Sequence, residues 1–289
     1  MTDWLELSRR ASFASHRLVG WIYWDPPAIE RYAALGVPDG LGWYVASRAA
    51  PLGDAGDQVV TAAFYSINPD FVAMGLDLCR SHTTFAATAA VRDRAVVEGL
   101  RTHVPEICDE LAAMGPALWA AADSLTPAGR VLFAAHRQWP RPDDPLASAW
   151  LAVNCIREWR GDTHWAIQIS EDLGEVAVGI LDGAWRGYED GWLPRSRGAD
   201  DDAIAAGLAE LEARGLAEQG AVTEAGIAHR ASLEDRLDRL CSAAWRDLGE
   251  DTTRRYLDLV EPVGERLMER IDETAGPNWM PAGRVRPLA

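Results

Sequence analysis

Residues 155–166, with the sequence CIREWRGDTHWA, gather side chains suited to binding a small molecule. Arg157 and Arg160 could clamp an anionic group, because a guanidinium presents a fork of donors to carboxylate or phosphate oxygens. Trp159 and Trp165 could form the walls of the same pocket, since ligand sites are lined mainly by apolar and aromatic side chains. This segment is therefore the first candidate site.

The same segment offers acid–base chemistry. We expect His164 in the first turn of a helix, where the helix dipole disfavours the imidazolium form and keeps the ring neutral at pH 7. A neutral histidine beside a carboxylate can act as a general base. His164, Asp162 and Glu158 are thus the candidate catalytic residues.

A structural interpretation of these charges stays open beside the functional ones. Arg157 or Arg160 could pair with Glu158 or Asp162 and join two helices about Gly161. Such an interior ion-pair network would need no ligand.

Three further residues are candidates for the ligand site. Arg48, in SRAAPLG (47–53), is a second clamp if the chain contains a duplicated helical unit. The similarity of FVAMGL (71–76) to EVAVGI (175–180) suggests such a duplication, but chance explains this similarity equally well. Trp43 lies just before this arginine. His16 falls on the first predicted helix near two tryptophans, and a core or surface histidine without function is the alternative.

Other motifs for catalysis are missing from the sequence. There is no H-x-x-x-H or H-E-x-x-H pattern, and the neighbouring arginines oppose a cation, so we expect no metal site. There is also no G-x-S-x-G elbow, P-loop or G-x-G-x-x-G fingerprint. The sequence indicates no particular cofactor.

Composition narrows the class of protein. The 289 residues carry a net charge of −16, which argues against binding to nucleic acid or anionic membranes. The chain has 13 Trp and no Lys, so all 28 basic residues are Arg. The four cysteines are widely spaced, as in a reduced cytosolic protein. We find no signal-peptide pattern and no apolar run long enough to span a bilayer, so we expect a cytoplasmic protein.

The elements that position these residues are predicted to be mainly helices. The proline-rich stretch WPRPDDP (139–145) divides the chain into a helical region, residues 1–140, and a second part, residues 141–289. In the second part we expect a helix over 146–159 that ends at Gly161, and another from Thr163 to about Leu173 with Asp162 as N-cap. Residues 175–186 are compatible with a strand or a helix. Apolar periodicity and caps predict further helices near 3–23, 28–35, 42–49, 59–67, 69–80, 86–101, 105–123 and 127–138.

The last third has the order of a winged helix. A helix over 200–214 precedes two short strands around Gln219-Gly220, and Thr223 caps a long helix. A final helix covers about 250–273. The fold class predicted is mainly α, with an N-terminal helical region and a winged-helix-like C-terminal half containing a small β-hairpin.

The segment LAELEARGLAEQGAVTEAGIAHR (208–230) resembles the recognition helix and wing of MarR-type regulators. With SRAAPLG (47–53), AAFYSINPDFV (62–72), WPRPDDPLASAW (139–150) and REWRGDTHWA (157–166), the chain also resembles a poorly characterised actinobacterial helix-turn-helix family from about residue 10 to 275. The resemblance implies a mostly helical fold with a winged-helix half and no settled activity. The sequence departs from the family pattern at Trp159, where a His is expected, and in the C-terminal tail.

The charge of the expected recognition helix argues against a DNA reader. The helix over 200–214 carries five acidic residues against Arg214 alone, and three of them are the aspartates at the end that would face the groove. We therefore expect a protein that binds, and perhaps transforms, a small aromatic or anionic molecule, with the winged helix as scaffold. The alternatives are a ligand-responsive MarR-like transcriptional regulator and a structural partner protein. A homodimer is expected, because winged-helix proteins often pair through their terminal helices.

Overall fold

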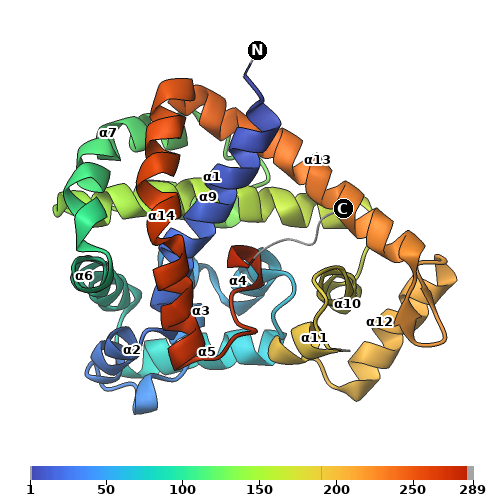
Figure 1. Ribbon diagram of the computed structural model, residues 1–289. Coiled ribbons are helices and arrows are strands. Elements are labelled where there is room, and N and C mark those ends of the chain that lie inside the picture. The colour runs from blue at the N-terminus through green and yellow to red at the C-terminus, as the bar shows by residue number, and fades with distance from the viewer. Residues whose placement is uncertain (1, 190, 285–289) are drawn as a thin grey trace.

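The computed structural model describes residues 2–189 and 191–284, and helices make up nearly all of it (Figure 1). The α-helices are α1 (Trp4–Gly20), α2 (Pro26–Ala33), α3 (Trp43–Ala49), α4 (Asp57–Phe64), α5 (Pro69–His82), α6 (Phe85–His103), α7 (Cys108–Ser124), α8 (Val131–Gln138), α9 (Pro145–Ser170), α10 (Glu175–Trp185), α11 (Trp192–Ser196), α12 (Asp201–Ala213), α13 (Glu224–Leu248) and α14 (Glu250–Thr274). Short 3-10 helices are η1 (Trp21–Trp24), η2 (Pro38–Gly40), η3 (Ala50–Ala55), η4 (Pro105–Ile107) and η5 (Pro281–Gly283). Strands β1 (Ala217–Glu218) and β2 (Ala221–Val222) form one hairpin, so the predicted mainly α fold class is confirmed.

Side-chain caps fix where several of these helices begin. The Asp144 carboxylate accepts hydrogen bonds from the Leu146 and Ala147 amides, at 2.8 and 3.1 Å, and so starts α9. Thr223 caps α13 in the same way through the Gly226 amide, as the sequence predicts. These side chains satisfy amides that have no partner within the helix, which favours a helix start at that residue.

The predicted break at Gly161 is wrong. Helix α9 runs without interruption through 26 residues, about 39 Å at 1.5 Å per residue. Glycine inside a helix lowers its stability but does not end it, and no proline follows. The Asp162 carboxylate instead accepts a hydrogen bond from the Phe133 amide at 2.8 Å and caps α8, which begins at Val131 rather than near 127.

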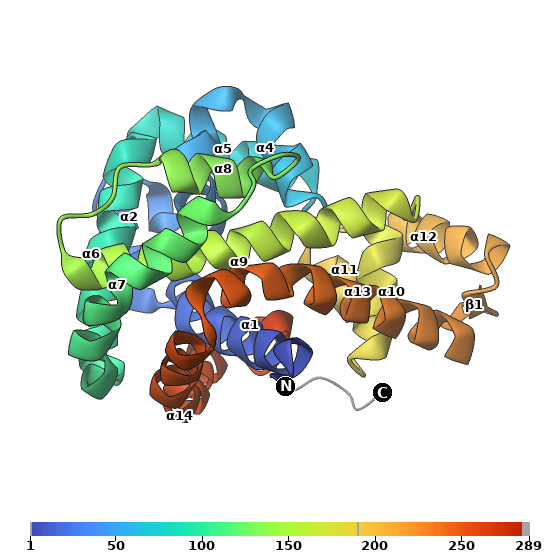
Figure 2. The same cartoon turned by 90° about the horizontal axis from the view of Figure 1, so that it is seen from above.

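Helix α9 forms the axis of the molecule. It is buried along most of its length and packs against α1, α7, α8 and α13 (Figures 1 and 2). The Trp150 indole, wholly buried on α9, donates to the Leu18 carbonyl of α1 at 3.2 Å. One hydrophobic core includes residues from both sides of the proline-rich stretch. The division into 1–140 and 141–289 stays a prediction.

The winged-helix elements lie together at one end of the molecule, on the right in both views (Figures 1 and 2). Residues 175–185, ambiguous in sequence, form helix α10, which packs against α11, α12 and α13. The hairpin pairs Ala217 with Val222 and Glu218 with Ala221. Gln219 and Gly220 both have positive φ, as a tight two-residue hairpin requires. Among the described residues, no helix is long and apolar enough to cross a membrane.

Candidate functional site

Two adjoining cavities open between α9, the winged-helix elements and the C-terminal segment (residues 275–284). The first, of about 150 Å³, is lined by six arginines and is called the arginine chamber: Arg48, Arg157, Arg160, Arg186, Arg197 and Arg230. The second, of about 290 Å³, is called the aromatic chamber and is lined by Tyr23, Trp24, Tyr44, Phe71, Trp192 and Trp279. His16, Arg157, Arg197, Pro281 and Ala282 line both cavities, and this shared wall is called the junction.

The uninterrupted course of α9 explains why its candidate residues meet at the arginine chamber. Arg157, Gly161 and His164 lie four and three residues apart, so they share one face of the helix. Arg160 and Trp165 flank this face and also line the chamber. The predicted site residues His16 and Arg48 reach it from α1 and α3.

Glu158 is the buried centre of one charge cluster. Its two carboxylate oxygens accept from Nε and Nη2 of Arg48 at 2.9 and 2.7 Å, a bidentate pair. Arg157 donates to the same carboxylate, to Asn154 Oδ1 at 3.2 Å and to the Tyr23 hydroxyl at 3.3 Å. Burial raises the pKa of Glu158, but Arg157 and Arg48 outweigh it and hold that pKa well below the ordinary value. Glu158 is therefore a fixed counter-charge, with no proton to exchange near pH 7.

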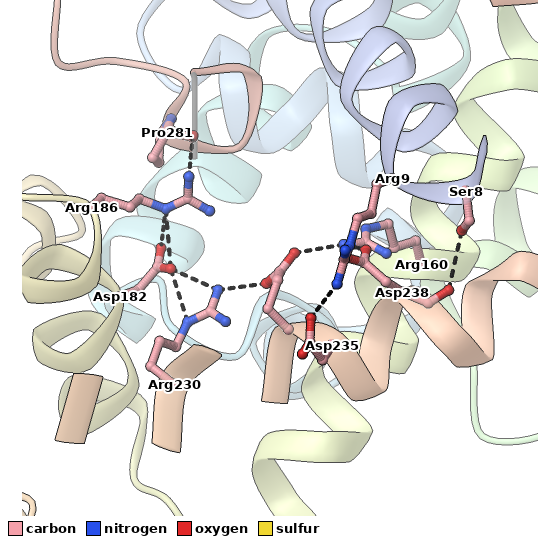
Figure 3. Close-up of polar contacts among 10 residues, drawn as sticks. Ser8, Arg9, Arg160, Asp182, Arg186, Arg230, Asp235, Asp238 and Pro281 are labelled. Atoms are coloured by element: carbon pink, nitrogen blue, oxygen red, sulfur yellow. Dashed lines mark hydrogen bonds and ion pairs between the residues drawn. The ribbon is translucent and has the colours of Figure 1, made fainter. Parts of the chain in front are cut away.

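A second charge network joins α9, α10 and α13 and is drawn in Figure 3. Asp182 accepts from Arg186 at 3.1 Å and from Arg230 at 2.7 Å. Glu234 connects Arg230, at 2.8 Å, to Arg160, at 2.6 Å.

Arg160 also reaches Asp238 at 2.8 Å, and Arg9 of α1 pairs with that same aspartate at 2.9 Å. An interior ion-pair network was one of the sequence-based interpretations. The predicted pair of Arg157 with Glu158 is present, whereas Arg160 bonds to carboxylates of α13 rather than to Glu158 or Asp162.

Arg197 is the exception among the arginines of the chamber. No ion pair or side-chain hydrogen bond of Arg197 occurs within residues 2–189 and 191–284, and its Nη1 is buried without a partner. Burial lowers the pKa of this guanidinium, while Asp182 acts in the opposite direction. Its backbone is held in place, since the Arg197 carbonyl accepts from the Asn68 amide at 2.8 Å. The side chain therefore stands at the junction as a positioned but unneutralised charge.

The aromatic rings of the aromatic chamber come from five separate segments of the chain. Trp24 of η1 stacks on Tyr44 of α3 with ring centroids 6.2 Å apart. Trp279 of the C-terminal segment lies 5.7 Å from Trp24 and 5.7 Å from Trp192 of α11. Phe71 of α5 is 41% exposed and lies at the solvent side. The rings border a mainly apolar space that adjoins the arginines of the junction.

The candidate acid–base residues do not form one group. His164 is half-buried in the arginine chamber, and burial together with the positive charge of Arg230 lowers its pKa to about 3. Burial raises the pKa of Asp162 to about 7, but this carboxylate is committed to capping α8. Within the described residues, no three His, Cys, Asp or Glu side chains are grouped so as to hold a metal ion.

Two predicted aromatic ligands of the site lie elsewhere in the structure. Trp43 is a core residue whose indole donates to the Ile22 carbonyl at 3.0 Å. Trp159 donates to the Thr126 carbonyl at 3.0 Å and is covered by Arg130. Neither lines a chamber, whereas Trp165 does and also stacks on Tyr65 with centroids 4.9 Å apart.

Sequence reasoning missed Arg197, Trp192 and Trp279. These residues lie in WLPRSRG (192–198) and GPNWMP (276–281), short stretches without apolar periodicity. The sequence did contain one signal, a tryptophan close to proline or glycine and outside every predicted helix. Such a tryptophan has no helix face to account for it, so it is a candidate for a binding site.

The chain was also compared with known proteins. A family model described as a helix-turn-helix family matches residues 8–274. No curated protein and no solved structure matches the chain. The family match extends from α1 to the end of α14, and the protein therefore belongs to this helix-turn-helix family.

Proposed function

We propose that the protein binds a small organic molecule whose flat apolar body enters the aromatic chamber, with the winged helix as scaffold. The aromatic chamber itself is the observation that carries this proposal. Its volume of about 290 Å³ is close to the lower limit of roughly 300 Å³ for ligand pockets. Aromatic faces line it and polar groups converge at one end, which is the usual composition of such pockets.

The surface of the winged helix supports a scaffold role. A DNA reader places the first residues of its recognition helix against base edges and grips phosphates with basic side chains. Here Asp201 and Asp202 are exposed at the start of α12, and Arg195 is paired with Asp201 at 2.6 Å. Arg214, at the other end, donates to the carbonyls of Glu171 and Asp172. These charges would repel phosphate groups at the surface where a reader needs to attract them.

A ligand-responsive regulator is the second candidate function. Membership of a helix-turn-helix family favours it, as does the MarR-like order of α10, α11, α12, hairpin and α13. In this alternative, a ligand in the aromatic chamber would act on α11, which supplies Trp192 to the chamber and precedes the recognition helix.

The scaffold proposal is tested with N-phenyl-1-naphthylamine, a neutral flat probe that fluoresces when it enters an apolar site. The wild-type protein is expected to bind it with a saturable signal. The variant Ser196→Trp fills the chamber, because Ser196 lines it, and should weaken binding by about tenfold, or 1.4 kcal/mol.

Ser232→Trp is the matched control. Ser232 is exposed on α13, and its hydroxyl donates to the carbonyl three residues earlier at 2.7 Å, as that of Ser196 does. This variant should bind like wild type. Absence of saturable binding, or equal binding by both variants, would overturn the proposal.

A further inference from the structure

We propose that the ligand carries an anionic group that binds at the junction, between Arg157 and Arg197. The inference rests on the proposed function for the position of the apolar body. It adds the charge of the ligand and the residues that bind the charged group. The ligand class is then an aromatic or similarly flat molecule with a carboxylate, sulfonate or phosphate at one end.

The distribution of charge within the arginine chamber is the first argument. Six arginines line it, and four carboxylates pair with them, which leaves two positive charges in excess. In the network of Figure 3, Arg186, Arg230 and Arg160 are matched by Asp182, Glu234 and Asp238. Arg48 and Arg157 share Glu158 alone, and Arg197 forms no ion pair with any described residue, although Asp182 is close enough to act on its pKa. The excess therefore belongs to the Glu158 cluster and to Arg197.

The place of these two charges is the second argument. Arg157 and Arg197 are the arginines that line both chambers, so the excess charge is located where the aromatic chamber ends. Arg48 already uses its fork on both oxygens of Glu158, and Arg157 is the arginine of that cluster that also lines the aromatic chamber. An anion at the junction would meet two guanidinium groups while its body stacked among the aromatic rings.

The burial of Nη1 in the half-buried Arg197 side chain is the third argument. A buried charge without a partner destabilises a protein unless something else neutralises it. Nη1 of Arg197 is buried and has no hydrogen-bond acceptor in the described structure. The chain as a whole is strongly acidic, with a net charge of −16, and most of its surface would repel anions. A local positive excess in such a protein is the arrangement expected of a built anion site.

Two probes that differ only in one charged group test the inference. The probe 8-anilinonaphthalene-1-sulfonate is N-phenyl-1-naphthylamine with an added sulfonate. Wild type should bind the sulfonate more tightly than the neutral probe. Arg197→Gln should weaken sulfonate binding by about tenfold or more, the loss of one charge-assisted contact, and leave the neutral probe unaffected.

Arg195→Gln is the matched control, because Arg195 lies in α11, which ends directly before Arg197 in the chain, but is exposed and paired with Asp201. It should change neither affinity. A variant Arg197→Gln that weakens both probes equally, or neither, would overturn the inference. If wild type binds the neutral probe but shows no preference for the sulfonate, the inference fails while the proposed function stands; if neither probe binds, the proposed function fails as well.

Thermal melting shows whether a variant that binds more weakly is also less stable. Because Arg197 has no partner among the described residues, replacing it by Gln or Met should leave Tm equal to or above that of wild type. A clear fall in Tm for both variants would show that the protein itself neutralises the charge, and would also overturn the inference.

Discussion

Glu158 is a buried carboxylate that forms ion pairs with two arginines. It lies at the centre of α9 with no exposed surface, and Arg48 and Arg157 both bond to its carboxylate. Arginine keeps its charge when buried, whereas lysine readily loses its proton there. The chain contains no lysine, so the positive charges of the cavity are fixed across physiological pH. The energetic cost of this arrangement should appear when the single counter-charge is removed.

Glu158→Gln is expected to lower the free energy of unfolding by about 3–5 kcal/mol, because two buried guanidinium groups lose their counter-charge. Urea unfolding measures this change. Glu261→Gln is the control, since Glu261 pairs with the partly exposed Arg10 and should cost less than about 1 kcal/mol. Equal effects of the two substitutions would contradict the account of Glu158 as a buried counter-charge.

Asp162 should make the free energy of unfolding depend on pH with a sign opposite to that of ordinary paired carboxylates. Its pKa rises from 3.8 to about 7 on folding, so the folded state favours the protonated form. This contribution to stability is complete below about pH 3.8 and is lost as pH rises through 7. Asp162→Asn keeps an acceptor for the Phe133 amide but cannot ionise.

The difference in unfolding free energy, wild type minus Asp162→Asn, should therefore decrease between about pH 4 and pH 7. Paired urea titrations at several pH values measure it. A difference that stays constant with pH would show that Asp162 does not titrate in this range.

At the scale of elements, α9 shows what the sequence could and could not predict. Local signals were sufficient for a cap such as Thr223, because a cap acts within three residues of its helix start. The effect of Gly161 was misjudged, because whether glycine ends a helix depends on the tertiary contacts around it. Asp162 looked like a cap for its own helix, but its partner is Phe133, 29 residues earlier.

The candidate site likewise contains residues that the sequence could predict and residues that it could not. Arg157, Arg160 and His164 were identifiable because they lie close together in sequence and share a helix face. Arg197 and Trp279 come from distant irregular segments, and only the fold brings them to the same cavity. Trp43 and Trp159 have the residue type of a ligand wall, but their burial in the packing of neighbouring helices could not be read from spacing.

Gly161→Ala should stabilise α9 by about 0.5–1 kcal/mol, because alanine restricts the unfolded chain and favours the helix. A Cβ at this position would lie 3.5 Å from Glu158 Oε2 and 3.9 Å from Arg48 Nη2, at ordinary contact distances. Thermal and urea unfolding measure the gain.

Gly99→Ala provides the contrast within another helix, α6. There a Cβ would come 2.2 Å from the Trp21 ring, so the same substitution should destabilise the protein. Destabilisation by both substitutions would mean that the space beside Gly161 is smaller than the structure shows.

At the scale of the whole molecule, the winged-helix elements lie at one end (Figure 2) and contact the rest through α13, through Asn68 before α5 and through the C-terminal segment. Its outward end carries Asp201 and Asp202, and the turn of the wing contains no arginine. The wild-type protein is expected not to shift a labelled fragment of its own upstream DNA at about 50 mM salt and micromolar concentration. A shift that weakens steeply as salt is added would instead support the regulator alternative.

The C-terminal segment has a consequence for the order in which the cavity is assembled. Trp279, Pro281 and Ala282 form a wall of the aromatic chamber, and hydrogen bonds from Arg17 to Gly283 and from Arg186 to Pro281 hold this wall in place. A ribosome synthesises the segment after all the other parts of that chamber. The cavity is therefore complete only after synthesis has passed this last wall.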